Sequence, residues 1–177
     1  MMNPAEYGKA LYLLAKEENI SDIILQQAGQ VTALLNENQK YVTLLDTPSV
    51  TGAEKNALLD KAFADLHPHL LNFMKILTSK RAMYLFSRAI SAYKDAYEED
   101  NNILNAYAVT VVPLNERQLA ALTSKLTKIT GKNVILQNRV DTSLVGGIRL
   151  QFDGKQLDAT VQTQLDALKK TLKQSTL

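Results

Sequence analysis

Residues 100 to 113 read DNNILNAYAVTVVP, and this stretch decides the fold. Ile103 to Val112 is rich in β-branched and aromatic residues and ends at Pro113, which predicts a β-strand. The sequence before it is patterned as helices, so we expect a domain boundary just ahead of the strand. The expected fold class is α+β, mostly α, with a six-helix bundle over residues 1–101 and a small α/β domain over residues 102–177.

The first hundred residues carry clear helix-start signals. Asn3 can cap a helix that has Pro4 at its first position and Glu6 at its third, and Thr51 with Glu54 forms a second capping box. Short connections between short helices predict a compact bundle. After the helix that begins at Pro4, helices are expected over residues 21–36, 39–46, 51–64, 68–78 and 82–99.

The second half alternates strands and helices. Asn115 can cap a helix over Glu116 to Thr130, which Gly131 would close. Strands are expected over Val134 to Val140 and Gly147 to Phe152, because apolar and polar residues alternate there. Asp153-Gly154 is a turn signal between two strands, and a last helix is expected from about Ala159 to Gln174. The strand order is left open.

Composition narrows the class of protein. Hydrophobic residues make up 46% and charged residues 21% of the chain, as in a soluble globular protein, and the absence of Cys excludes disulfides, thiolate metal sites and a Cys nucleophile. A net charge of +2 is too balanced to indicate nucleic-acid binding. The longest apolar run, Ala10 to Ala15, is too short to span a bilayer. No signal segment opens the chain, so we expect a cytoplasmic protein unless a partner holds it at a membrane.

Few residues are arranged for metal binding or acid–base chemistry. His67 and His69 could bind a metal only with further ligands, and Asp65 is the only other candidate nearby, so a helix start is the preferred interpretation. Asp141 and Asp158 could be imagined as paired carboxylates, but turn and strand-end positions explain them better. No catalytic or metal-binding residue is assigned.

Glycine-rich segments can bind phosphate, which makes Gly146 and Gly147 candidates for such a segment. Gly146 and Gly147 lie within a strand pattern, but neither common phosphate-binding glycine spacing is present, so a bulge or close backbone contact is expected. We therefore expect no cofactor, no small-molecule substrate and no enzymatic activity, and surfaces become the candidates for function.

The first helix has more apolar surface than a small bundle needs. Tyr7, Ala10, Leu11, Leu14 and Ala15 make one apolar stripe. Residues 5, 8, 12 and 15 make a second stripe of small and aromatic side chains. One stripe would be buried, and the sequence leaves open which.

The fifth helix has the same excess. Leu70, Leu71, Phe73, Met74, Ile76 and Leu77 nearly encircle it. Two such helices side by side would leave a groove for a partner helix, although both could instead be central in the bundle. Gly8 would allow close backbone approach and Met74 would adapt to the ligand. The predicted groove residues are Tyr7, Gly8, Leu11, Tyr12, Ala15, Leu70, Phe73, Met74 and Leu77.

The order of these segments resembles the ATP synthase delta family, called the oligomycin-sensitivity-conferring protein in mitochondria, across nearly the whole chain. The most specific part is Val140 to Leu168, VDTSLVGGIRLQFDGKQLDATVQTQLDAL. Supporting matches are YGKAL from Tyr7, Arg81 after the fifth helix, and Val112-Pro113-Leu114 ahead of Gln118-Leu119. The chain departs from the family at Asp158-Ala159-Thr160, where Asp-Gly-Ser is common, and at Gly8, where Ala is common.

The resemblance implies a non-catalytic stator subunit of a bacterial F-type ATP synthase. The first and fifth helices would receive the N-terminal helix of the alpha subunit, and the C-terminal domain would bind the C-terminal end of the b-subunit stalk. For that second contact we expect Leu165, Leu168 and Leu172 of the last helix. The protein would lie at the cytoplasmic face of the cell membrane, held there through the complex.

A nucleic-acid-associated protein is the alternative. Its C-terminal domain would use strand aromatics as a stacking platform, for which the sequence offers Tyr107 and Phe152. The basic residues that would meet phosphates are Lys125, Lys128, Lys132, Lys169, Lys170 and Lys173.

Overall fold

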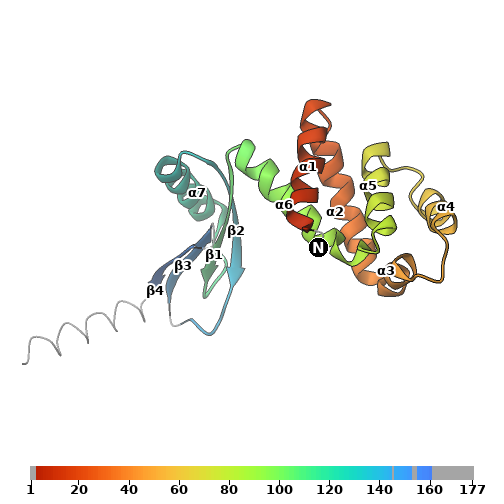
Figure 1. Cartoon of the computed structure of the whole chain (residues 1–177). Helices are drawn as coiled ribbons and strands as arrows, with labels where there is room; N and C mark the ends of the chain where they lie inside the picture. The colour runs from red at the N-terminus through yellow and green to blue at the C-terminus, as the bar shows by residue number, and fades with distance from the viewer. Residues whose placement is uncertain (1–2, 145, 153–154, 161–177) are drawn as a thin grey trace, which may run out of the picture. The chain divides into compact units, whose positions relative to one another are not determined.

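The computed structural model describes residues 3–144, 146–152 and 155–160 of the chain, and these residues fall into two compact units (Figure 1). The first unit is Met1–Glu98 and the second begins at Glu99. Each has its own hydrophobic core. The described part is mostly helical with one small mixed sheet, which agrees with the predicted α+β class.

The first unit is helical throughout. Its helices are α1 (Pro4–Glu17), α2 (Ser21–Glu37), α3 (Gln39–Asp46), α4 (Gly52–Ala62), α5 (Pro68–Ser79), the 3-10 helix η1 (Met83–Leu85) and α6 (Phe86–Asp100). The two predicted helix caps are present. Asn3 Oδ1 accepts a hydrogen bond from the Ala5 N–H at 3.1 Å, and Thr51 and Glu54 form the expected capping box. The helix expected from residue 82 instead begins with the 3-10 turn, and α4 ends two residues early.

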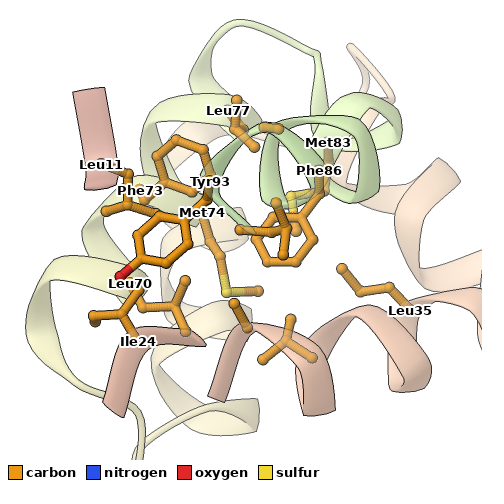
Figure 2. Close-up of a cluster of buried hydrophobic side chains, with 14 of the residues drawn as sticks. Leu11, Ile24, Leu35, Leu70, Phe73, Met74, Leu77, Met83, Phe86 and Tyr93 are labelled. Carbon is orange, nitrogen blue, oxygen red and sulfur yellow. The ribbon is translucent and has the colours of Figure 1, made fainter. Parts of the chain in front are cut away.

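One hydrophobic core joins α1 to α6 (Figure 2). Its largest fully buried side chains include Tyr93 and Phe86 of α6 and Met74 of α5. The ring of Phe86 lies 6.1 Å from the ring of Phe73, centroid to centroid. Tyr93 satisfies its hydroxyl by donating to the Ser21 carbonyl at 2.9 Å, which ties α6 to the start of α2.

The second unit is a four-stranded sheet with one helix. Its elements are β1 (Ile103–Thr110), α7 (Glu116–Thr130), β2 (Asn133–Val140), β3 (Gly147–Phe152) and β4 (Lys155–Thr160). The strand order is β2-β1-β3-β4, with β1 parallel to β2 and antiparallel to β3, and β3 antiparallel to β4. The helix α7 connects the two parallel strands and packs its Leu126 on the sheet core.

Most helix and strand ends of this second unit lie close to where the local sequence predicts them. Asn115 caps α7 together with Gln118, and Gly131 ends it in the left-handed conformation at φ 70°, as expected. The expected strand to Val112 ends earlier, at Thr110. Gly147 begins β3 with φ 88°, a conformation that residues other than glycine rarely adopt, so glycine is required at this strand start.

The expected start of the last helix at Ala159 is wrong. Ala159 and Thr160 are the last residues of β4, because β4 pairs with β3 from Phe152↔Lys155 to Gly147↔Thr160 and this ladder supplies hydrogen-bond partners on the β3 side. The remainder of that predicted helix lies outside the described residues.

Candidate partner-binding groove

A shallow groove of about 260 Å³ runs between α1 and α5. Its lining is mainly apolar. The lining residues are Tyr7, Ala10, Leu11 and Leu14 of α1 with His69, Asn72, Phe73 and Ile76 of α5. The groove therefore lies between the two helices whose apolar excess predicted it.

The groove has a buried floor and an open rim. Leu11 and Phe73 are only 5% and 6% exposed and belong to the hydrophobic core, whereas Leu14 and Ile76 are 38% and 40% exposed. Solvent-exposed leucine and isoleucine on facing helices lose contact with water if another apolar surface covers them. This arrangement suits an amphipathic helix lying along the groove.

The small-residue stripe of α1 faces the protein interior. A Cβ atom added to Gly8 would stand 2.0 Å from the Ala89 carbonyl oxygen of α6, so the close backbone approach that glycine allows is made within the chain. The Tyr12 ring lies edge-on to the Tyr93 ring at 5.5 Å. Ala15 is 1% exposed. Gly8, Tyr12 and Ala15 of this stripe are therefore buried, as is Leu11 of the other stripe, whereas Leu14 stays partly exposed.

Three predicted groove residues of α5 also lie in the core rather than in the groove. Leu70, Met74 and Leu77 are each 0% exposed (Figure 2). Of the nine predicted residues, the groove lining contains Tyr7, Leu11 and Phe73. A partner contact by the other six stays a prediction, and their burial in the isolated chain does not favour it.

Three lining residues lie outside the predicted groove set although they belong to the apolar surfaces of the two helices. Ala10 and Leu14 belong to the first apolar stripe of α1, and Ile76 belongs to the excess of α5. Periodicity indicates that two faces of a helix are apolar, but it does not tell which face the bundle covers. The sequence feature that indicates the covered face of α1 is the glycine within this helix, because α6 approaches α1 at Gly8.

One end of the groove carries a hydrogen bond between two helices and a helix cap. His69 Nε2 lies 2.7 Å from Glu18 Oε2, which links the start of α5 to the end of α1. His67 is the N-cap of α5, and its Nδ1 accepts a hydrogen bond from the His69 N–H at 3.3 Å. His67 and Pro68 therefore form the predicted helix start.

The two aspartates of the second unit each have a structural partner of their own. Asp141 Oδ1 accepts hydrogen bonds from Ser143, 2.6 Å from its Oγ and 3.0 Å from its N–H, and the hydroxyl bond chiefly lowers the pKa of Asp141. Asp158 lies opposite Arg149 in the β3–β4 ladder and pairs with it at 3.2 Å. Within the described ranges, no three His, Asp or Glu side chains converge on a metal site.

The strand aromatics of the second unit do not form an open stacking platform. The Arg139 guanidinium lies 3.7 Å over the centre of the Tyr107 ring, and Phe152 packs against the sheet core. Lys125 and Lys128 are exposed on α7. The predicted stalk residues Leu165, Leu168 and Leu172 lie outside the described residues, as do Lys169, Lys170 and Lys173.

No helix in the described part of the chain is both long enough and apolar enough to cross a bilayer.

Comparisons with known proteins agree over most of the chain. Residues 5–172 match the sequence profile described as "ATP synthase delta (OSCP) subunit". The chain is 30% identical to the ATP synthase subunit delta of Clostridioides difficile over 94% of this chain and 93% of that protein. It is 31% identical to the same subunit of Lacticaseibacillus casei over 94% and 92%.

A solved structure has the same fold. One chain of the Toxoplasma gondii mitochondrial ATP synthase hexamer aligns with a TM-score of 0.71 at 19% sequence identity, covering 97% of this chain and 98% of that one. At this identity the likeness concerns the fold.

Proposed function

This chain belongs to the ATP synthase delta (OSCP) subunit family, and we propose that its α1–α5 groove receives the N-terminal helix of the alpha subunit. As a member of that family it is a non-catalytic stator subunit that links the catalytic head to the peripheral stalk. It associates with other ATP synthase subunits and is a peripheral part of the membrane-bound complex.

The observation that carries the proposal is the half-open groove. Leu11 and Phe73 form a floor already fixed by the core, so a partner helix meets a preformed surface and the chain loses little conformational entropy on binding. Leu14 and Ile76 offer the apolar area that such a helix would cover. We take the first unit as the six-helix bundle that holds this surface rigid.

A stator junction requires slow dissociation, and the groove geometry is compatible with it. Nanomolar affinity corresponds to about 12 kcal/mol, which an interface of ordinary size with apolar anchors can reach. We further propose that the second unit binds the C-terminal end of the b-subunit stalk at the cytoplasmic face of the membrane. Two contacts on one chain raise the effective concentration of each partner near the other.

Isothermal titration of the full chain with a synthetic peptide of the same organism's alpha-subunit N-terminal helix tests the proposal. We expect saturable one-to-one binding with a negative heat-capacity change, since apolar surface is buried. Ile76→Ser and Leu14→Ser should weaken binding, because each removes a rim side chain that is already partly exposed and whose loss is tolerated by the fold.

Leu34→Ser is the matched control, because Leu34 of α2 is 50% exposed and does not line the groove. It should bind as the unaltered chain does. Absence of binding by the folded, unaltered chain would remove the groove from the proposal.

A further inference from the structure

A second pocket, of about 390 Å³, adjoins the groove on a neighbouring face of α5. Residues of α4 and α5 and of the segments that precede α4 and follow α5 line it. Asn72 and Ile76 of α5 line both the pocket and the groove. The two hollows are therefore separated by one ridge of α5, and a ligand lying in the groove can extend over that ridge into the pocket.

The pocket is cationic. Its lining includes Lys55, Lys75 and Arg81 and contains no acidic side chain. Lys75 Nζ pairs with Asp60 Oδ1 at 2.5 Å. Among the described residues no acidic side chain pairs with Lys55 or Arg81, although Lys55 is only 5% exposed. An anion entering the pocket would therefore meet two cationic side chains that no acidic side chain of the described residues neutralises.

One hydroxyl group in the pocket lining can form a further hydrogen bond. Thr78 Oγ1 is buried and has no hydrogen-bond partner within the described chain. Other helical threonines here donate to the carbonyl one turn earlier, as Thr32 does to Ala28 at 2.7 Å and Thr123 to Leu119 at 2.8 Å. Buried polar atoms are nearly always paired in native proteins, so this hydroxyl indicates a polar ligand.

The backbone at Arg81 is held in an unfavourable conformation. Arg81 follows α5 with φ 53°, the left-handed position in which helices usually place glycine. The Ala82 N–H donates to the Leu77 carbonyl at 3.0 Å, which closes the helix end around this residue. Glycine would adopt this φ at lower cost, so an arginine there is explained if its side chain has a function in the pocket.

We propose that the pocket binds a carboxylate at one end of the helix that occupies the groove. The inference rests on the proposed function and specifies its partner: an amphipathic helix whose apolar face covers Leu14 and Ile76 and whose acidic end lies over Lys55 and Arg81. The acidic end must then lie toward the C-terminal end of α5, since Thr78 and Arg81 are there. The pocket thereby sets the direction in which the helix lies.

Titration of the full chain with the alpha-subunit N-terminal peptide at low and high salt tests the proposal. Lys55→Met removes the charge and keeps the length of the stem, and Arg81→Gly removes the guanidinium while relaxing the backbone. Each should lower the affinity about tenfold at low salt and flatten its salt dependence. Arg81→Gly should not lower the melting temperature, which separates a binding role from a structural one. Lys40→Gln, an exposed charge on α3 outside the pocket, is the matched control and should bind normally.

A second peptide, with its Asp and Glu replaced by Asn and Gln, completes a double-mutant cycle. If a carboxylate enters the pocket, this peptide loses the same factor in affinity, and Lys55→Met then causes no additional loss. Unchanged affinity and salt dependence in both pocket variants, with binding still weakened in Leu14→Ser, which lines the groove alone, would overturn the pocket proposal and leave the groove intact. A folded chain that binds neither peptide would overturn both.

Discussion

A Cβ atom added to Gly8 of α1 would stand 2.0 Å from the carbonyl oxygen of Ala89 and 3.0 Å from the Tyr93 nitrogen, both on α6. Real Cβ atoms do not approach backbone oxygen so closely, so the two helices pack with glycine at their contact because no other residue fits. The face of α1 that includes Gly8 is thereby fixed inward, and Leu14 is left on the groove side.

Gly8→Ala should destabilise the first unit by about 2 kcal/mol or more, because α1 must move away from α6 to admit the methyl group. Alanine favours helices over glycine, so the steric effect must exceed an opposing gain of about 1 kcal/mol. Chemical denaturation of the full chain measures the difference in unfolding free energy.

Gly29→Ala provides the comparison in the same unit. Gly29 lies within α2, and a Cβ atom added there meets nothing within 4 Å. This change should stabilise the chain by about 0.5–1 kcal/mol through helix propensity alone. If both substitutions stabilise the chain to the same extent, the described α1–α6 contact is wrong.

Tyr93 should make the first unit sensitive to alkaline pH. Burial, the largest cause, raises its pKa from 10.0 to about 12. Below pH 10 the phenol is protonated in the folded and unfolded chains, so its contribution to stability is complete. As pH rises from 10 towards 12 the unfolded chain releases the proton first, and the free energy of unfolding falls.

Tyr93→Phe should change that profile in two ways. It loses the hydrogen bond to the Ser21 carbonyl, which costs about 1 kcal/mol near neutral pH, and it flattens the decline between pH 10 and 12. Thermal unfolding monitored across this range measures both effects. An unchanged alkaline decline in the variant would assign it to other groups.

The helices and their caps were largely predictable because their signals are local. Pro4 after Asn3, and Thr51 three residues before Glu54, determine helix starts through hydrogen bonds between near neighbours. The last strand was not predictable in this way. Ala159 favours helix locally, and only pairing with Ile148 of β3 places it in a sheet.

The two helices that form the groove could be predicted from the sequence, but most of its lining residues could not. Apolar excess identified α1 and α5, yet which side chains remain open depends on how α6 packs against α1. Met74 illustrates the limit, since its helix is apolar almost all round and its 0% exposure follows from the surrounding helices. The cationic pocket has no local signal, because Lys55 and Arg81 are brought together only by the packing of α4 and α5.

Tyr41→Phe should leave the stability unchanged or raise it by up to about 1 kcal/mol. The Tyr41 hydroxyl is buried without a hydrogen-bond partner in the described chain, so removing it relieves an unfavourable desolvation. The edge-on contact with the Phe63 ring, at 6.3 Å, is retained in the variant. Denaturant unfolding measures the change, and a loss of stability well above 1 kcal/mol would indicate that the hydroxyl has a partner.

Asn138 should be the most sensitive polar residue of the second unit. Its Nδ2 donates to the Ala108 carbonyl and to Thr110 Oγ1, both at 2.8 Å, and its Oδ1 accepts from the Leu114 N–H at 2.8 Å. One side chain on β2 thus satisfies groups on β1 and on the segment leading to α7.

Asn138→Ala should therefore destabilise the second unit by about 2–3 kcal/mol, because it removes the acceptor of the Leu114 N–H and two further hydrogen bonds to β1. Gln137→Ala, an exposed neighbour on the same strand, is the matched control and should change stability little. Hydrogen exchange resolves the effect by region. Faster exchange confined to β1, β2 and α7 is expected, since the helical unit has a separate core. Equal acceleration in α1 to α6 would mean instead that the two units unfold as one.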